Sequence, residues 1–256
     1  GLLKQNQYII PHRKIRAPHH TSSAVSLVGG GAYPRPGEIS LAHRGILFLD
    51  EFPEFSRNVL ESLRQPLEEG KITVSRASGS VTYPARFMLM AAMNPCPCGN
   101  FNDPDKPCIC SASSILKYNK KVSGPLLDRI DIHIRVPRES IFFSVPENGS
   151  ENSGSIRLRV EKARGIQLKR FSNENILTNA EMSNKQVKKF CALDNETEKL
   201  LASYAMTKRL SHRAFFKIIK LARTAADLDE SGNILSKHIL QVVNYRADEL
   251  DSSIFG

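Results

Sequence analysis

The sequence lacks any apolar run approaching the roughly 18 residues that a membrane-spanning helix needs. Its first residues, Gly-Leu-Leu-Lys-Gln, also lack the charged, apolar and small-residue regions of a secretory signal. Both absences argue against membrane and secreted proteins, so we expect a soluble, cytoplasmic protein that makes no membrane contact. With 256 residues, 41% of them hydrophobic, the chain has enough apolar material for one large domain or two small ones.

Acidic residues are in deficit: 26 Asp and Glu stand against 36 Lys and Arg, which leaves a net charge of +10. This excess favours a polyanionic partner, although a basic protein without such a partner can have the same balance. Residues 1–110 carry 12 basic and 9 acidic side chains, a net +3, and residues 111–256 carry 24 and 17, a net +7. The second half is therefore the better candidate for contacting phosphates.

Three apolar runs, at residues 45–51, 87–93 and 130–136, predict buried strands. Residues 57–69 have apolar side chains at helical spacing and end at Gly70, which predicts an amphipathic helix. Residues 71–76 and 80–83 alternate around a turn at Gly79 and predict a hairpin. Strands that alternate with helices indicate an α/β fold with a parallel sheet.

A polar, turn-forming stretch at residues 146–155 predicts a linker. After it the patterns are helical only, at residues 156–171, 195–204, 212–228 (capped by Ser211) and 236–248. We therefore expect an α/β domain over residues 1–145 with a cysteine-rich insert at 96–110, and an all-helical domain over residues 156–256.

The first predicted strand ends in Asp50 and Glu51. Phosphoryl transfer to water needs one carboxylate to hold Mg²⁺ and a second to orient the attacking water, and adjacent acids at a strand end supply both. A strand that simply ends in solvated acids is the alternative.

The flanking sequence is more specific. Arg-Ala-Pro-His-His (16–20), Pro-Gly-Glu-Ile-Ser-Leu-Ala-His (36–43) and Asn-Pro-Cys-Pro-Cys-Gly (94–99) follow one another in an order that resembles the magnesium-chelatase-like AAA+ ATPases, and within them the competence-associated bacterial branch. The resemblance runs from about residue 16 to about residue 246. It implies a partial AAA+ parallel-sheet core followed by a helical lid domain.

The same resemblance assigns roles. Asp50 is similar to the Mg²⁺ carboxylate, Glu51 to the general base and Asn94 to the sensor that polarises the attacking water. Arg129 is similar to the arginine finger that reaches the nucleotide of a neighbouring subunit, and Arg213 to the second sensor, which binds nucleotide. ATP and Mg²⁺ are the implied cofactors, and a homo-oligomeric ring, expected to be a hexamer, is the implied assembly.

One part of a nucleotide site is missing: the phosphate-binding string Gly-x-x-x-x-Gly-Lys-[Ser/Thr] occurs nowhere in the sequence. In the family that the chain resembles, this loop precedes the Arg-Ala-Pro-His-His segment. We therefore expect the chain to be a C-terminal piece of an ATPase, which by itself binds ATP poorly and hydrolyses none.

Four cysteines form two Cys-x-Cys pairs: Cys96, Cys98, Cys108 and Cys110. Four thiolates suit a structural Zn²⁺, and a cytosolic setting argues against structural disulfides; free thiols or adventitious disulfides are the alternatives. A metal here would hold the neighbouring Asn94 in position. Cys191 stands alone and is expected to be a packed side chain.

The hairpin and residues 29–43 resemble the two pore-facing inserts of this AAA+ branch. Arg35, Lys71 and Arg76 are therefore candidate contacts to nucleic-acid phosphates, with ordinary solvated residues as the alternative. His19 and His20 are adjacent and point apart on an extended chain, which favours a structural role over a shared metal.

These observations favour the C-terminal AAA+ portion of a ring-forming, ATP-dependent, DNA-associated motor of the helicase or branch-migration type. One alternative is a motor subunit that inserts Mg²⁺ into a tetrapyrrole. The other is a non-enzymatic, zinc-stabilised module that binds nucleic acid.

Overall fold

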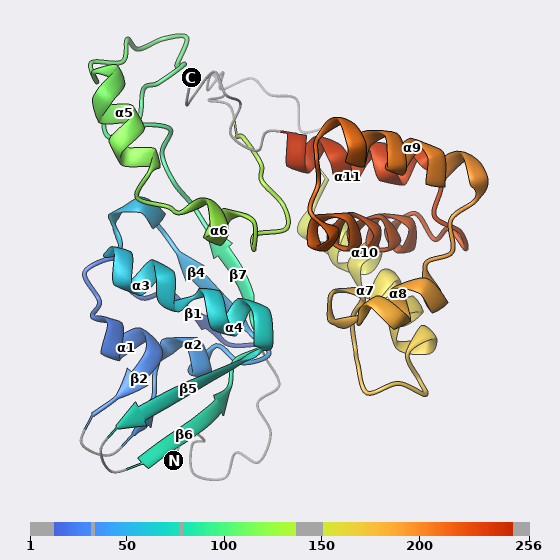
Figure 1. Ribbon diagram of the computed structural model, residues 1–256, viewed down its shortest axis with the longest axis horizontal. Helices are drawn as coiled ribbons and strands as arrows, with labels where there is room; N and C mark the ends of the chain where they lie inside the picture. The colour runs from blue at the N-terminus through green and yellow to red at the C-terminus, as the bar shows by residue number, and fades with distance from the viewer. Residues whose placement is uncertain (1–12, 32–33, 77–78, 137–150, 248–256) are drawn as a thin grey trace. The chain divides into compact units, whose positions relative to one another are not determined.

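The computed structural model describes residues 13–31, 34–76, 79–136 and 151–247. The chain divides into two compact units, residues 1–130 and residues 131–256 (Figure 1). The predicted linker at residues 146–155 falls in the second unit, and its first five residues lie outside the described part. Among the described helices, none combines the length and apolar character needed to cross a bilayer.

The first unit is built on a parallel sheet in the order β1 (Ile15–Arg16), β4 (Ile46–Leu49) and β7 (Met88–Ala91). The register aligns Ile46 with Met88 and Leu49 with Ala91. The predicted strands at residues 45–51 and 87–93 are thus confirmed, each somewhat shorter than its apolar run. The fold class, an α/β core followed by helices, is confirmed as well.

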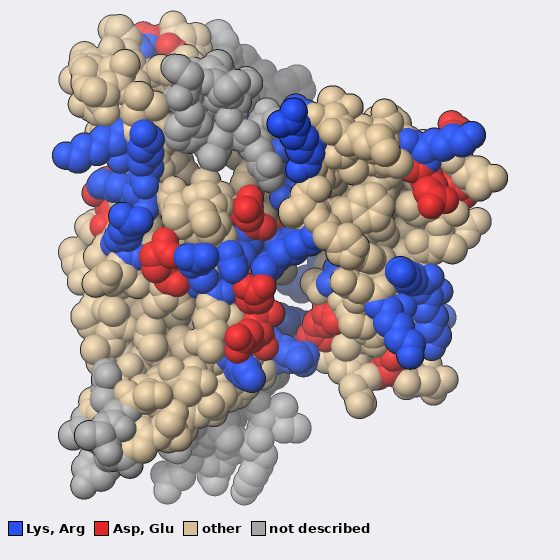
Figure 2. Space-filling model, viewed as in Figure 1, with Lys and Arg blue, Asp and Glu red and all other residues tan. Residues whose placement is uncertain are grey.

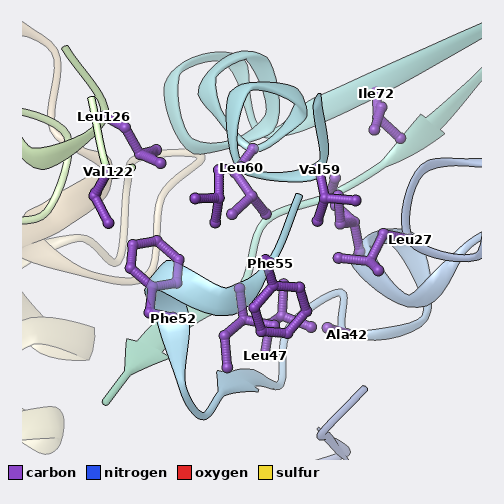
Figure 3. Close-up of a cluster of buried hydrophobic side chains, with 14 residues drawn as sticks. Leu27, Ala42, Leu47, Phe52, Phe55, Val59, Leu60, Ile72, Val122 and Leu126 are labelled. Atoms are coloured by element: carbon purple, nitrogen blue, oxygen red, sulfur yellow. The ribbon is translucent and has the colours of Figure 1, made fainter. Parts of the chain in front are cut away.

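One face of this sheet is covered by a single hydrophobic core. Leu47 and Leu49 point into it together with Leu27, Leu60 and Leu126, all of them buried (Figure 3). These leucines come from the sheet, from α1 (Ala24–Val28), from α3 (Arg57–Ser62) and from α6 (Gly124–Leu127). Short helices that could not persist alone are therefore held by the apolar side chains they bury.

The predicted helix at residues 57–69 is two helices, α3 and α4 (Arg64–Glu69), which meet at Leu63. Pro66 explains the break, because proline has no N–H for the carbonyl of Ser62 and its ring crowds that carbonyl. The predicted end at Gly70 is confirmed: Gly70 adopts φ +66° and its N–H donates to the Pro66 carbonyl.

The predicted hairpin is also confirmed, as β5 (Lys71–Arg76) and β6 (Gly79–Pro84). Ile72 and Val74 are buried, while hydroxyl groups pair across the exposed face, Thr73 with Thr82 at 3.0 Å. Tyr83 donates to the carbonyl of Pro34 at 2.8 Å, which ties the hairpin to the turn before β3 (Arg35–Pro36). β3 pairs in turn with β2 (Gly29–Gly30), and α2 (Glu38–Leu41) follows.

The prediction of a third strand at residues 130–136 is wrong. Residues 131–136 join no ladder, and Ile134 and Val136 are exposed. A strand of a parallel sheet needs a neighbour and two apolar faces, but Asp131, His133 and Arg135 make one face polar. No neighbouring strand is available to this segment in the described part of the chain.

The second face of the sheet carries exposed apolar side chains. Met88 and Met90 are 62% and 47% exposed, and Ile15 lies on the same side of the sheet through its alignment with Ile46. Strands of parallel sheets are normally buried on both faces. Exposed apolar surface of this kind favours association.

We expect the isolated chain to self-associate at micromolar concentration through this face. The double substitution Met88→Glu and Met90→Glu places charges on it and should shift the chain towards monomer in sedimentation velocity. The control is Met206→Glu, a methionine on α9 (Asn195–Thr207) in the second unit that is more exposed still, at 81%. A wild-type chain that sediments as a monomer would contradict the expectation.

The second unit contains α7 (Ser153–Arg170), α8 (Asn184–Phe190), α9, α10 (His212–Leu228) and α11 (Ser236–Ala247). The four predicted helices are confirmed, α10 with the predicted bounds and with Ser211 as its cap. The sequence analysis missed α8, although Ser183 and Gln186 form a capping box at its start. The core contains Leu201, Ile218, Ile219, Ala222 and Ile239 from three of these helices.

A buried ionic network joins the helices of the second unit. Asp227, fully buried in α10, accepts hydrogen bonds from Arg170 on α7, from Asn179 and from Arg223 on its own helix. Arg223 also donates to the carbonyls of Ser231 and Gly232. The network therefore fixes both the packing of α7 on α10 and the turn after α10.

Candidate active-site edge and cysteine cluster

The residues that follow β1, β4 and β7 meet at one edge of the sheet, called here the carboxyl edge (residues 17–20, 50–51 and 92–94). Backbone hydrogen bonds continue past the strand ends: the N–H of Ala92 donates to Leu49 and that of Phe52 donates to Ala92. The end of β4, with its two acids, is therefore held against the end of β7, and Asn94 lies three residues beyond that end.

Asp50 and Glu51 leave β4 in different directions. Asp50 is exposed, and one of its carboxylate oxygens accepts the N–H of Glu51 at 2.9 Å. Glu51 has φ +51° and ψ +45°, a left-handed conformation that costs an L-residue roughly 1–2 kcal/mol. The surrounding structure must enforce such a conformation, and four other described non-glycine residues also have a positive φ.

His20 holds the carboxylate of Glu51, with its Nδ1 2.7 Å from Oε2. The sequence analysis gave His19 and His20 a structural role and did not foresee this contact. His19 instead pairs with the hydroxyl of Thr21 at 2.9 Å. The available signal was the position of the histidines directly after a strand that neighbours the one ending in Asp50 and Glu51.

A second pair of motifs is joined beside this edge. Arg16 makes two hydrogen bonds to Glu38, at 2.5 and 2.6 Å, and this contact raises the pKa of the arginine. Glu38 belongs to the Pro-Gly-Glu segment and Arg16 begins the Arg-Ala-Pro-His-His segment. The bidentate pair thus anchors α2 to the end of β1 and helps to place His20.

Asn94 is exposed, and its backbone lies close to Tyr118, a buried side chain of α5 (Ala112–Asn119). Burial raises the pKa of Tyr118. Asn94 therefore follows a strand end that is hydrogen-bonded to β4, and it lies beside α5.

Arg129 lies away from the carboxyl edge. Its guanidinium donates to Glu68 of α4 at 2.5 Å and to the carbonyl of Pro125 in α6 at 2.6 Å. Its side chain is only 16% exposed. The structure thus places Asp50, Glu51 and Asn94 together and Arg129 elsewhere in the same unit.

Arg213 belongs to the second unit, where it is exposed in the first turn of α10. Lys217 and Lys220 follow at intervals of four and three residues, so the three cations share one face of the helix. Burial lowers the pKa of Lys217, which pairs with Asp131 at 2.7 Å, and the charge of Arg213 contributes to the lowering. The sequence analysis missed both lysines.

The basic candidates of the inserts occupy the hairpin and β3. Lys71 is exposed, with Glu69 3.9 Å away, and Arg35 is exposed in β3. Arg76 ends β5, and its side chain lies outside the described part. The hydrogen bond between Tyr83 and Pro34 brings the segment of Arg35 against the hairpin that carries Lys71.

The four cysteines form one cluster. The sulfur of Cys96 lies 3.4 Å from that of Cys98 and 3.7 Å from that of Cys108, and the sulfurs of Cys98 and Cys108 are 3.6 Å apart. The sulfur of Cys110 completes a group within 4.8 Å of one another. Sulfurs placed tetrahedrally at about 2.3 Å from Zn²⁺ are about 3.8 Å apart, so the spacing fits such an ion.

All four thiols are free, and their protonation differs. Backbone N–H groups of Asn100 and Ile109 donate to Cys98 and lower its pKa to about 6. Cys108 has a pKa raised to about 12, because burial and the neighbouring thiols outweigh the N–H of Cys110. The cluster can therefore hold a metal, and binding would release protons from the remaining thiols.

The fold and the carboxyl edge define an α/β protein whose acidic side chains stand at the carboxyl ends of parallel strands, where such sheets bind their ligands. Comparison with known families is specific. Residues 1–142 match the model of magnesium chelatase, subunit ChlI, and residues 150–246 match the model of its C-terminal part. The chain belongs to this family, as the sequence motifs predicted.

Curated relatives include the uncharacterized protein YifB of Escherichia coli, 43% identical over 236 residues, which are 92% of this chain and 46% of that protein. The competence protein ComM of Haemophilus influenzae is 41% identical over 242 residues, 92% of this chain and 45% of ComM. A weaker match, 28% over 141 residues, covers 51% of this chain and 14% of the DNA replication licensing factor Mcm2 of Drosophila melanogaster. The chain thus spans about half the length of YifB and of ComM.

Proposed function

We propose that this chain is the C-terminal AAA+ portion of an ATP-dependent motor that acts on DNA as a homo-oligomeric ring. The observation that carries the proposal is the carboxyl edge: adjacent carboxylates after β4, the second in a left-handed conformation, with Asn94 beside them after β7. A pair of acids in this arrangement suits the hydrolysis of a phosphoanhydride, in which one carboxylate holds Mg²⁺ and the other accepts the proton of the attacking water.

Mg²⁺ fits Asp50, because the residue is exposed and its carboxylate oxygens are the hard donors that this ion prefers. The ion supplies charge neutralisation on the outer phosphates of ATP when both are bound. Glu51 then accepts the proton of the attacking water, and Asn94 orients that water. His20 positions Glu51 through the contact between its Nδ1 and Oε2.

The remaining parts of the nucleotide site come from elsewhere. This sequence contains no glycine-rich phosphate loop, so the cradle for the phosphates is contributed by another segment of the whole protein. Arg129 is proposed to exchange Glu68 for the nucleotide of a neighbouring subunit, and Arg213 to contact nucleotide from the second unit. Both arginines would offset the charge that develops in the transition state.

Three observations support DNA as the substrate. The chain has a net charge of +10, it is similar to a competence protein, and it is more weakly similar to DNA replication licensing factors. Arg35, Lys71 and Arg76 on the inserts are the proposed phosphate contacts. The family model named for magnesium chelatase supports the rival reading, insertion of Mg²⁺ into a tetrapyrrole.

The deciding experiment measures ATP hydrolysis by the full-length protein alone, with single-stranded DNA, with branched DNA and with a porphyrin. Stimulation by DNA and displacement of a labelled strand that depends on ATP are the expected results. Stimulation by the porphyrin but not by DNA would favour the rival, and no hydrolysis in any mixture would favour a non-enzymatic module.

We further propose that the cysteine cluster binds one structural Zn²⁺, which holds residues 96–110 and, through them, Asn94. The purified chain should contain about one zinc per molecule by elemental analysis, given four ligands of the usual kind. The double substitution Cys98→Ser and Cys110→Ser should remove the metal and lower the melting temperature of the first unit. Cys191→Ala, outside the cluster, is the control and should keep the zinc; a metal-free wild-type protein purified without chelator contradicts the proposal.

A further inference from the structure

A basic hollow lies in the first unit between η1 (Phe52–Glu54) with the start of α3 on one side and α5 on the other. Its volume is about 690 Å³, within the usual range of ligand pockets. Pro53, Phe55 and Leu116 supply apolar lining. Figure 2 shows lysine and arginine side chains gathered between α5 and α3.

Four cations and one carboxylate line this hollow. Lys121 pairs with Glu54 at 2.9 Å, which accounts for the single acid. Arg57, Lys117 and Lys120 are exposed, and no carboxylate among the described residues lies within ion-pair distance of them. The hollow therefore has an excess positive charge of about three.

The backbone around these cations is firmly held. The helices α5 and α3 form the two walls of the hollow, and each has buried side chains. Ile115 and Tyr118 are buried on α5, and Val59 and Leu60 on α3, so packing holds both helices in place. Arg57 lowers the pKa of Glu61 through space, but Glu61 is already paired with Arg64 at 2.8 Å. The three cations are thus presented to solvent from anchored helices, and no carboxylate of the described residues pairs with them.

We propose that this hollow binds the phosphates of single-stranded nucleic acid. Three cations around one open hollow match a chain of phosphates, and the apolar lining can accept the face of a base. The proposal deepens the DNA motor proposed above, and it adds a contact surface separate from Arg35, Lys71 and Arg76. A free nucleotide offers the same phosphate chemistry and is separated from nucleic acid by the experiment.

The test is fluorescence anisotropy of a labelled oligothymidylate of about 20 nucleotides, titrated with the chain over a range of salt concentrations. The triple substitution Arg57→Gln, Lys117→Gln and Lys120→Gln should raise Kd about tenfold and reduce the salt slope by about 2, since each single-strand phosphate contact contributes about 0.7. The control, Lys185→Gln, Lys199→Gln and Lys208→Gln on α8, α9 and the cap of α9, removes the same charge and should leave Kd within about twofold.

Equal weakening by both triple variants, or no weakening by the first, overturns the proposal. So does a result in which the oligothymidylate binds unchanged while ATP or pyrophosphate loses affinity, because the ligand is then a free phosphate compound. Where the triple variant melts early, Lys117→Gln with Lys120→Gln alone should reduce the slope by about 1.4. The assay contains no hydrolysis step, so its outcome is independent of whether the full-length protein is an ATPase.

Discussion

Replacing Glu51 by glutamine in the full-length protein is expected to lower the rate of ATP hydrolysis by about 10²–10⁴-fold, the usual contribution of a general base. Glutamine keeps the size of the side chain and can still contact His20, but it cannot take a proton from water. ATP affinity should change little, because Asp50 rather than Glu51 is the proposed Mg²⁺ ligand.

The matched control for this substitution is Glu69→Gln. Glu69 is an exposed acid of α4 that contacts Gln65 and Lys71, and its loss should leave the rate within about twofold. A Glu51→Gln protein that hydrolyses ATP as fast as the Glu69→Gln protein would remove Glu51 from the mechanism.

Asp227→Ala is expected to destabilise the second unit by about 3–5 kcal/mol, because it leaves Arg223 and Arg170 next to a buried site without their shared carboxylate. The loss should appear as a lower midpoint in urea unfolding followed by circular dichroism at a wavelength that reports helix. The expected loss is a large part of the stability of an ordinary domain.

The matched control is Glu230→Gln, which removes an exposed ion-pair partner of Lys162 on α7. This substitution should lower the free energy of unfolding by less than about 1 kcal/mol. Similar midpoints for the two variants would mean that the buried network does not hold α7 on α10.

Local patterns predicted most of the elements. The run that ends in Asp50 and Glu51 identified β4, and the alternation on either side of Gly79 identified the hairpin. α10 was predicted with its observed bounds, because the cap at Ser211 and the apolar spacing agree. Pro66 indicated a break between α3 and α4. The prediction of one continuous helix over residues 57–69 relied on apolar spacing alone and did not use this proline.

What failed depends on contacts between distant segments. Residues 130–136 have the apolar alternation of a strand, but a strand exists only where another supplies its hydrogen bonds, and periodicity does not contain that information. α8 is short, so its capping box was outweighed by its few apolar residues.

The candidate site divides in the same way. Spacing was enough to predict that four cysteines gather, and the strand ends were enough to place Asp50 near Asn94. The contact of His20 with Glu51 and that of Arg129 with Glu68 each join residues from different elements. Local sequence patterns cannot predict such contacts. The hollow beside α5 combines residues about 60 positions apart, so it too emerges only from the fold.

The most direct test of the account is a parallel measurement of ATP binding and ATP hydrolysis in the full-length protein and its Glu51→Gln variant, with Mg²⁺ present. The account predicts that both proteins bind ATP with similar affinity and that only the wild type hydrolyses it. Equal hydrolysis by the two proteins, or binding by neither, would contradict the claim that the carboxyl edge is part of an ATP site.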